Sequence, residues 1–325
     1  NADANPVGAA IDLTSITGGG ATLVLNGGNS GAITVTGAVD ELTELTIRQS
    51  NGATFQSPFG TGMPGAVTIN DTTDGQAVAF QGDTAITILT TTSEGYDVSF
   101  TGSQTTITEN VRFLNTGQVT LGDAATDVLL FDAGVHTAGS ASNPSMTNIF
   151  ATVWTSGDAL ELGSVTLAGN SILDTTNADA NPAGATLTVG AVSGEGITLT
   201  LDAGNGGTAS IGQVGSAEDP LTSLTVDAAL VSLGGDVFAN EQNYNADVTL
   251  RGDVDLVVAS GGALTFRQQL SAVGNALTLT ADEIDFSGGV NSVSGTGPLT
   301  LQPVTDEVSI DIGSPSDGAG MLDIS

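Results

Sequence analysis

Short segments in which apolar residues alternate strictly with polar ones, mostly threonine or serine, recur along the whole chain. Examples are residues 21–25, 32–36, 66–69, 118–121 and 197–201, and each is closed by Gly, Asn or Asp. A two-residue period places the aliphatic side chains on one face of a strand and the threonines on the other. Helical periodicity is almost absent, so the sequence predicts an all-β fold whose apolar strand faces need a common core.

A long internal repeat constrains how these strands are arranged. The sequence Asn-Ala-Asp-Ala-Asn-Pro at residues 1–6 returns unchanged at residues 177–182, and further matches follow, such as residues 22–25 with 198–201 and residues 42–47 with 221–226. Repeats of this kind indicate an array of stacked units. We assign residues 1–176 to the first repeat unit of one continuous solenoid and residues 177–325 to a second, incomplete unit. We expect the chain to be a window from a longer array.

The strands are short and evenly spaced, which is typical of either a β-solenoid or tandem β-sandwiches. Aromatic residues make up only 4% of the chain and there is a single Trp, whereas sandwiches of the immunoglobulin type usually bury a large aromatic anchor. We therefore predict a parallel β-helix with roughly 20–25 residues per coil, and keep tandem β-sandwiches as the alternative. Residues 238–245 are expected to form a loop.

The charge of the chain excludes several classes of partner. It carries 36 acidic residues, four Arg and no Lys, for a formal net charge of −32. Four scattered Arg cannot form the basic surface that nucleic acids or anionic membranes require. There is no Cys, and no apolar run approaches the ~18 residues of a membrane-spanning helix, so we expect neither disulfides nor membrane insertion.

Candidates for catalysis are few. A Ser-His-Asp system would have to use His136, the only histidine, which lies in a turn-like sequence. Paired carboxylates could hydrolyse glycosides, but with so many acids such pairs arise by chance. The pairs considered are Asp253/Asp255, Asp282/Glu283/Asp285 and Asp306/Glu307. We predict that the chain is not an enzyme, and keep a glycan-processing β-helix as an alternative.

Metal binding is the more plausible chemistry. The duplicated block places oxygen ligands at alternate positions, as calcium loops do, which makes Asp3, Asn5, Asp179 and Asn181 calcium candidates. The block lacks the acidic twelfth residue of an EF-hand, and Asx residues that bond their own backbone explain it as a turn. We favour the turn, expect no required cofactor, and keep a calcium-dependent adhesive module as a further alternative.

Several phrases of the sequence share a characteristic vocabulary. They are Leu-Asp-Thr-Thr-Asn at residues 173–177, Pro-Leu-Thr-Ser-Leu-Thr-Val at 220–226, Gly-Asn-Ala-Leu-Thr-Leu-Thr-Ala-Asp-Glu-Ile-Asp-Phe at 274–286 and Ser-Gly-Thr-Gly-Pro-Leu-Thr-Leu-Gln-Pro at 294–303. This vocabulary resembles the repeat regions of giant bacterial exoproteins of the filamentous-haemagglutinin-like and large-adhesin type.

The resemblance implies a right-handed parallel β-helix that serves as a stalk or fibre outside the cell or on its surface. It also implies neighbouring copies as partners, joined end to end or laterally, together with cell-surface glycans or proteins. It brings no catalytic or cofactor-binding residues to any position of this chain.

Overall fold

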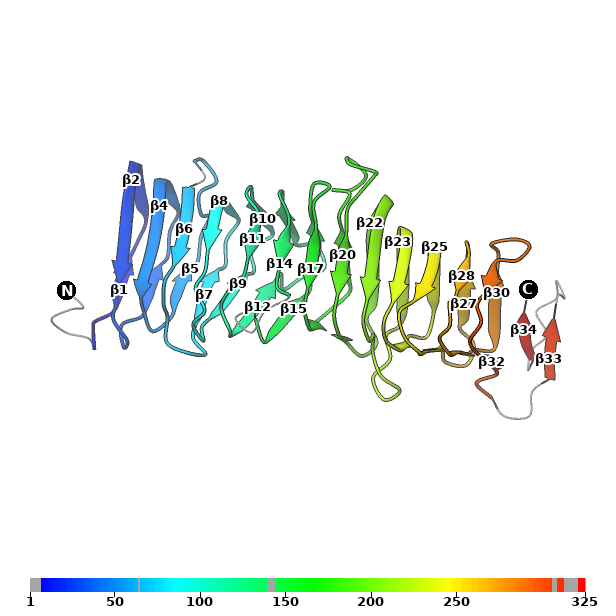
Figure 1. Ribbon diagram of the computed structural model, residues 1–325. Helices are drawn as coiled ribbons and strands as arrows, with labels where there is room; N and C mark the ends of the chain where they lie inside the picture. Colours follow the sequence, from blue (N-terminus) through cyan, green and yellow to red (C-terminus); the bar gives the residue numbers. More distant parts are fainter. Residues whose placement is uncertain (1–6, 64, 139–143, 306–308, 313–320, 325) are drawn as a thin grey trace. The chain divides into compact units, whose positions relative to one another are not determined.

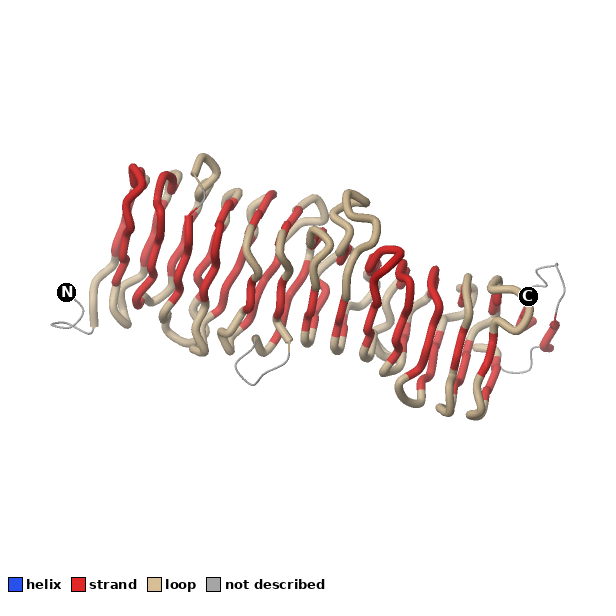
Figure 2. The backbone as a smooth tube through the Cα atoms, turned by 45° about the horizontal axis from the view of Figure 1, so that its top comes forward, coloured by secondary structure: helices blue, strands red, loops and turns tan. Residues whose placement is uncertain are grey.

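Every regular element that the structure describes is a β-strand. The computed structural model describes residues 7–63, 65–138, 144–305, 309–312 and 321–324, and side chains up to residue 305. It divides into two compact units, unit 1 (Asn1–Ala168) and unit 2 (Gly169–Ser325). The tube view shows strands and loops but no helix in these residues (Figure 2).

Within unit 1 the strands form parallel ladders, seen as successive arrows from blue to green in Figure 1. The first ladder runs β1 (Ile11–Leu13), β3 (Ile33–Val35), β5 (Ala53–Phe55), β7 (Ala77–Phe80), β9 (Asp97–Phe100), β12 (Gln118–Leu121), β15 (Met146–Ile149) and β18 (Val165–Leu167). The second runs β2 (Ile16–Asn26), β4 (Val39–Gln49), β6 (Gly65–Ile69), β8 (Thr84–Thr90), β10 (Gln104–Ile107), β13 (Val128–Phe131) and β16 (Thr152–Trp154). A third, shorter ladder contains β11 (Val111–Arg112), β14 (Val135–His136) and β17 (Leu160–Leu162).

Unit 2 repeats the arrangement. Its longest ladder runs β19 (Ser171–Asp174), β22 (Thr198–Ile211), β23 (Ser223–Leu233), β25 (Gln242–Leu250), β27 (Ala263–Phe266), β30 (Glu283–Phe286), β34 (Met321–Ile324) and β33 (Ser309–Ile312). β20 (Leu187–Val189) also pairs with β22, and β25 continues into β28 (Leu270–Ser271) and β31 (Val293–Ser294). A further ladder contains β24 (Val237–Phe238), β26 (Val254–Val257), β29 (Leu277–Thr280) and β32 (Leu299–Gln302). β21 (Val192–Ser193) reaches it through Val214, which bridges both Val192 and Val237 of β24.

These ladders make each unit a parallel β-solenoid, which confirms the predicted fold class. The alternative of tandem sandwiches is wrong, because sandwiches are built from antiparallel sheets and these ladders are parallel. Each turn of the solenoid is called a rung. The rungs differ in length more than expected, since the chain from Gln118 to its partner Met146 is much longer than the chain from Thr147 to its partner Val165. The loop expected at residues 238–245 is also wrong, since most of it belongs to β24 and β25.

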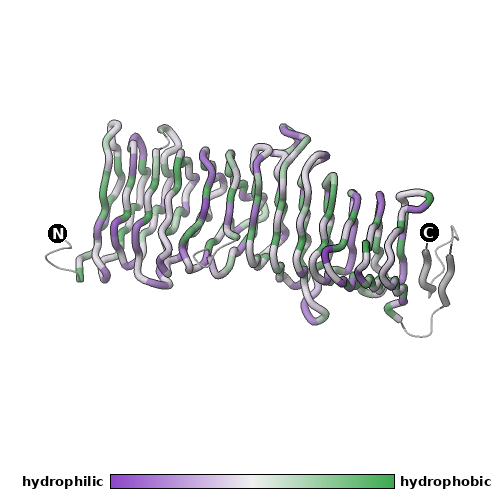
Figure 3. Tube along the Cα trace, in the orientation of Figure 1, coloured by the Kyte–Doolittle hydropathy of each residue, from purple (hydrophilic) through white to green (hydrophobic). Residues whose placement is uncertain are grey.

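The core follows from the alternation in sequence. The hydropathy view shows apolar and polar residues succeeding one another along the strands (Figure 3). Because parallel strands pair in register, like residues stack on like: the rings of Phe55, Phe80 and Phe100 lie 5.2 and 5.0 Å apart. Tyr244, Phe266 and Phe286 form a second stack in unit 2. Offset ring stacking adds to the hydrophobic stabilisation of such a core.

The repeated glycines build the same tight corner in both units. Gly8 and Gly184 both have positive φ, and a Cβ on Gly8 would lie 1.7 Å from the carbonyl oxygen of Gly27. A Cβ on Gly184 would lie 2.0 Å from the carbonyl oxygen of Ala203, the counterpart of Gly27. Only glycine allows the two backbone segments to approach this closely. This close approach gives the duplicated glycines a physical reason.

Several acidic residues link one rung to the next through side-chain hydrogen bonds. In eight places within the described residues, the side-chain Oδ1 of an Asp or Asn accepts a hydrogen bond from a backbone N–H on the following rung. The pairs are Asp40 with Met63, Asp83 with Gln104, Asp97 with Gln118, Asn170 with Thr198, Asp236 with Asp255, Asp247 with Gln269, Asp253 with Ala276 and Asp282 with Val304. These side-chain oxygens satisfy backbone N–H donors that strand pairing leaves without an acceptor.

Candidate functional site

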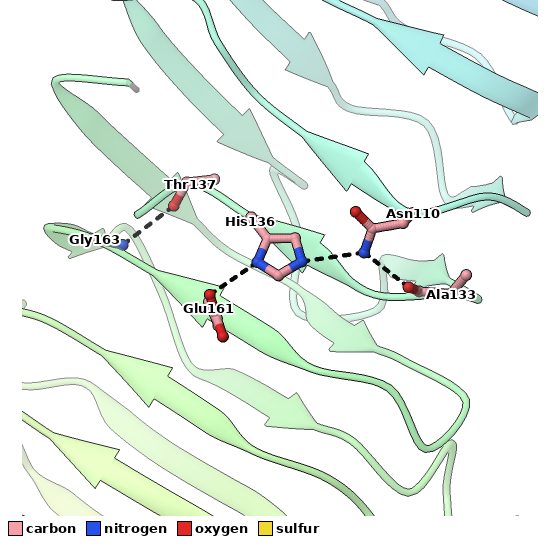
Figure 4. A network of polar contacts seen from close by, with 6 residues as sticks. All are labelled: Asn110, Ala133, His136, Thr137, Glu161 and Gly163. Atoms are coloured by element: carbon pink, nitrogen blue, oxygen red, sulfur yellow. Dashed lines mark hydrogen bonds and ion pairs between the residues drawn. The ribbon is translucent and has the colours of Figure 1, made fainter. Parts of the chain in front are cut away.

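His136 belongs to a polar network that crosses three rungs of unit 1 (Figure 4). It lies in β14, opposite Arg112 of β11 and Glu161 of β17. Its Nδ1 lies 2.9 Å from Glu161 Oε2, and its Nε2 lies 3.1 Å from Asn110 Nδ2. The His136 side chain is 14% exposed and that of Glu161 is 39% exposed.

The partners define the tautomer of the ring. Asn110 Nδ2 also donates to the carbonyl oxygen of Ala133 at 2.9 Å, so the amide nitrogen faces both groups. Because an amide nitrogen only donates, His136 Nε2 accepts and Nδ1 carries the proton that is donated to Glu161. In a Ser-His-Asp system Nε2 takes the proton of the nucleophile. Here the Asn110 amide occupies that atom, and the network ties rungs together.

The paired carboxylates serve mainly as local hydrogen-bond acceptors. Asp253 and Asp282 bond backbone N–H groups of the next rung, at 2.8 and 3.1 Å. Both oxygens of Asp285 accept from the hydroxyl of Ser287. Asp306 and Glu307 lie outside the described residues.

Trp154, the single tryptophan of the chain, is half-buried beside the fully buried Val153, so its side chain points to the outer face of β16.

Of the calcium candidates, Asp3 and Asn5 lie outside the described residues, and Asp179 and Asn181 are exposed in a turn. Residues 177–179 all have positive φ, a left-handed conformation that Asn and Asp tolerate best. The buried carboxylate of Asp174 holds this turn by accepting from the N–H and hydroxyl of Thr176 and from the N–H of Ala178. Thr176 in turn accepts from the N–H of Asp179 at 2.9 Å.

A shallow acidic pocket lies beside this turn in unit 2. Parallel register places Asp174, Asp202, Asp227 and Asn245 on successive rungs. An open pocket of about 350 Å³ is lined by Asp179, Pro182, Asp202, Gly204, Asn205, Asp227, Ala228 and Asn245. Sequence reasoning singled out Asp179 and missed the rest, because their proximity depends on a register that their irregular spacing conceals.

Burial raises the pKa of Asp202 above its ordinary value, and the neighbouring carboxylates of Asp174, Asp227 and Asp179 raise it further. A hydrogen bond from the N–H of Gly204, at 2.8 Å, acts in the opposite direction. Asn245 donates to Asp227 at 2.7 Å, while its own Oδ1 is buried and accepts no hydrogen bond. The pocket therefore brings several carboxylates close together, and the hydrogen bonds from Gly204 and Asn245 offset their repulsion only in part.

In the part of the chain that the structure describes, no three His, Asp or Glu side chains are arranged to hold a metal ion. The described residues also contain no helix that is long and apolar enough to cross a membrane. Comparison with known proteins finds no matching protein family, curated protein or solved structure.

Proposed function

We propose that this chain is a non-enzymatic structural segment, a stalk or fibre, of a large secreted adhesin-like protein on a bacterial surface. The observation that carries the proposal is the in-register parallel stacking within each unit. In such a stack each rung contacts chiefly its neighbours, so added rungs contribute length and lateral surface. That is the property a stalk needs.

Two further features support this proposal. The sequence resembles the repeat regions of large bacterial exoproteins, and a net charge of −32 favours solubility outside the cell. The acidic residues that cap rungs also serve the solenoid itself, as Asp97 does for Gln118. The partners in this proposal are neighbouring copies, with cell-surface glycans or proteins as the targets of the whole adhesin.

Labelling of intact bacteria tests the location. An antibody raised against the folded chain is expected to bind cells of the source bacterium without permeabilisation. A signal that appears only after permeabilisation would overturn the proposal. A matched antibody against a cytoplasmic protein of the same cells controls for their integrity.

An activity screen tests the absence of catalysis. The purified chain is expected to release no reducing ends from a panel of acidic and neutral polysaccharides. Turnover that disappears on Asp253→Asn or Asp285→Asn would contradict the structural role and favour a glycan-processing β-helix. Each amide variant keeps a side-chain oxygen as hydrogen-bond acceptor, so it separates loss of chemistry from loss of folding.

A further inference from the structure

The outer edge of β2 in unit 1 is an unpaired strand edge. On one side β2 pairs with β4, from Leu23 opposite Leu45 to Asn26 opposite Gln49. No other strand in the described residues pairs with its second side. Leu23 is half-buried and Val24 is 59% exposed. Such an edge is a template for a further strand.

The internal repeat identifies what covers the equivalent edge in unit 2. Leu23 and Leu25 correspond to Leu199 and Leu201 of the second copy, and both of these are fully buried. They are covered by β19, in which Ser171 lies opposite Leu199 and Leu173 opposite Leu201. The same sequence pattern is thus paired in one unit and open in the other.

Transferred to unit 1, the β19 sequence fits the open edge better than it fits its own place. Ile172, 40% exposed in unit 2, would lie beside the exposed Val24 instead of beside Thr200. Asp174, which faces the like-charged Asp202 in unit 2, would face the amide of Asn26. Cross-strand pairs of apolar residues stabilise a sheet, whereas like charges directly opposite each other destabilise it.

The residue after β19 supplies a second anchor. Thr175 donates its N–H to the carbonyl oxygen of Asp202 at 2.8 Å, and its hydroxyl accepts from the N–H of Ala185 at 2.9 Å. The counterparts of those two groups in unit 1 are the carbonyl of Asn26 and the N–H of Ala9. Both lie at the duplicated glycine corner, so the backbone that receives Thr175 is already built there.

We propose that the open edge of β2, residues 22–26, is a docking surface for the strand that ends another copy of this repeat. The docked strand has the Ser-Ile-Leu-Asp-Thr pattern of residues 171–175 and adds in parallel, Leu opposite Leu25 and Asp opposite Asn26. The inference rests on the proposed function for the expectation that copies are joined, and on the repeat for the register.

A chain extension tests it directly. A copy of residues 169–176 is placed immediately before Asn1, which reproduces the natural junction because residues 1–6 repeat residues 177–182. The extension is expected to slow deuterium uptake of the segment Ile16–Asn26 by at least about tenfold, since the outward N–H groups of β2 become hydrogen-bonded. Thermal unfolding is expected to shift upward as well.

The matched control is the same extension with the change Leu173→Asp in the copied segment. This change places a charge at the position whose side chain points into the core. It is expected to leave uptake of Ile16–Asn26 as fast as in the unextended chain. Equal uptake in both extended chains would overturn the proposal.

Sedimentation of the unextended chain supplies an independent outcome. Concentration-dependent association that Val24→Lys abolishes would mean that another part of a second chain occupies the edge, and would also overturn the assignment. An outcome that overturns strand addition, in either experiment, leaves the proposed location at the bacterial surface unaffected. Failure of the labelling experiment, conversely, leaves strand addition intact.

Discussion

Asp202 shows how a parallel ladder acts on single residues. Register places it directly between Asp174 and Asp227, so three carboxylates follow one another at the spacing of neighbouring strands. Burial and these neighbours raise its pKa in the folded state. The folded protein therefore binds this proton more tightly than the unfolded chain does, and ionisation of Asp202 opposes folding.

The substitution Asp202→Asn is expected to stabilise the protein at neutral pH. It removes the charge but keeps Oδ1 as an acceptor for the N–H of Gly204. The gain in free energy of unfolding should be about 0.5 kcal/mol at pH 7, the scale of a solvent-screened like-charge pair. Because the pKa of Asp202 is raised in the folded state, the charge penalty sets in as the pH rises above the ordinary Asp pKa and is complete above the raised folded-state pKa.

The pH dependence separates this cause from others. At about pH 2, well below the ordinary Asp pKa of about 3.9, Asp202 is protonated in both states, and the advantage of the variant should vanish. Urea unfolding at the two pH values measures the difference, and Asp202→Ala, which also removes the acceptor, is the control. A variant as stable as the original chain at pH 7 would contradict the account.

At the scale of the strand and the rung, the sequence predicted the type of element but not its partners. Alternation identified the strand segments at residues 21–25 and 197–201 correctly, because it reflects local burial. β22 nevertheless extends from Thr198 to Ile211, since register shifts after Asp202 and Gly204 let pairing continue through a bend. Irregularities of this kind depend on contacts between rungs and leave no local signal.

The partners of the candidate residues His136 and Asp179 did not emerge from the sequence for the same reason. Glu161 is the partner of His136 on the next rung, and Asp174 bonds the turn that contains Asp179. Rungs differ widely in length within unit 1, so no fixed spacing in the sequence connects such pairs. The duplicated block forms a turn from residue 177, but the residues that hold this turn, Asp174 and Thr176, lie before it.

The carboxylate between rungs is expected to stabilise each connection by a modest amount. Asp97→Ala removes the acceptor 2.7 Å from the N–H of Gln118, and should lower the free energy of unfolding by about 1 kcal/mol. Asp97→Asn keeps an oxygen in the same place and should lose less than half of that. The denaturant midpoints of the two variants measure the difference, and equal losses would show that charge rather than the hydrogen bond matters.

The aromatic stack should contribute more. Phe80→Ala leaves a cavity between Phe55 and Phe100, both fully buried, and is expected to reduce the free energy of unfolding by about 3–5 kcal/mol. Phe286→Ala, at a half-buried position that ends the described stack in unit 2, is the matched comparison and should have a smaller effect. Chemical denaturation monitored by circular dichroism checks both.

At the scale of the whole molecule, the charge is the dominant feature. A net charge of −32 with only four Arg means that most carboxylates repel one another without a basic partner. Self-repulsion opposes a compact state, and it is screened as ionic strength rises. Stability should therefore depend on salt throughout the chain and not at one site.

Raising NaCl from about 10 to about 150 mM is expected to raise Tm by at least about 2 °C, since the screening length falls from about 30 to about 8 Å. Calcium chloride at matched ionic strength should raise Tm gradually and without saturation. A sharp, saturable response to one or two calcium ions would contradict this prediction and return attention to the turn at Asp179.

The positions of the four arginines determine where trypsin can cleave the chain. With no Lys in the chain, trypsin can cut only after Arg48, Arg112, Arg251 and Arg267. The first two lie inside β4 and β11, and the others directly follow β25 and β27, so the backbone on at least one side of each bond is held in a ladder. Cleavage then requires a rung to open, and the rate of each cut reports the opening of one named rung. A protein built this way resists one of the commonest protease specificities through the scarcity of its sites and the parallel pairing that covers them.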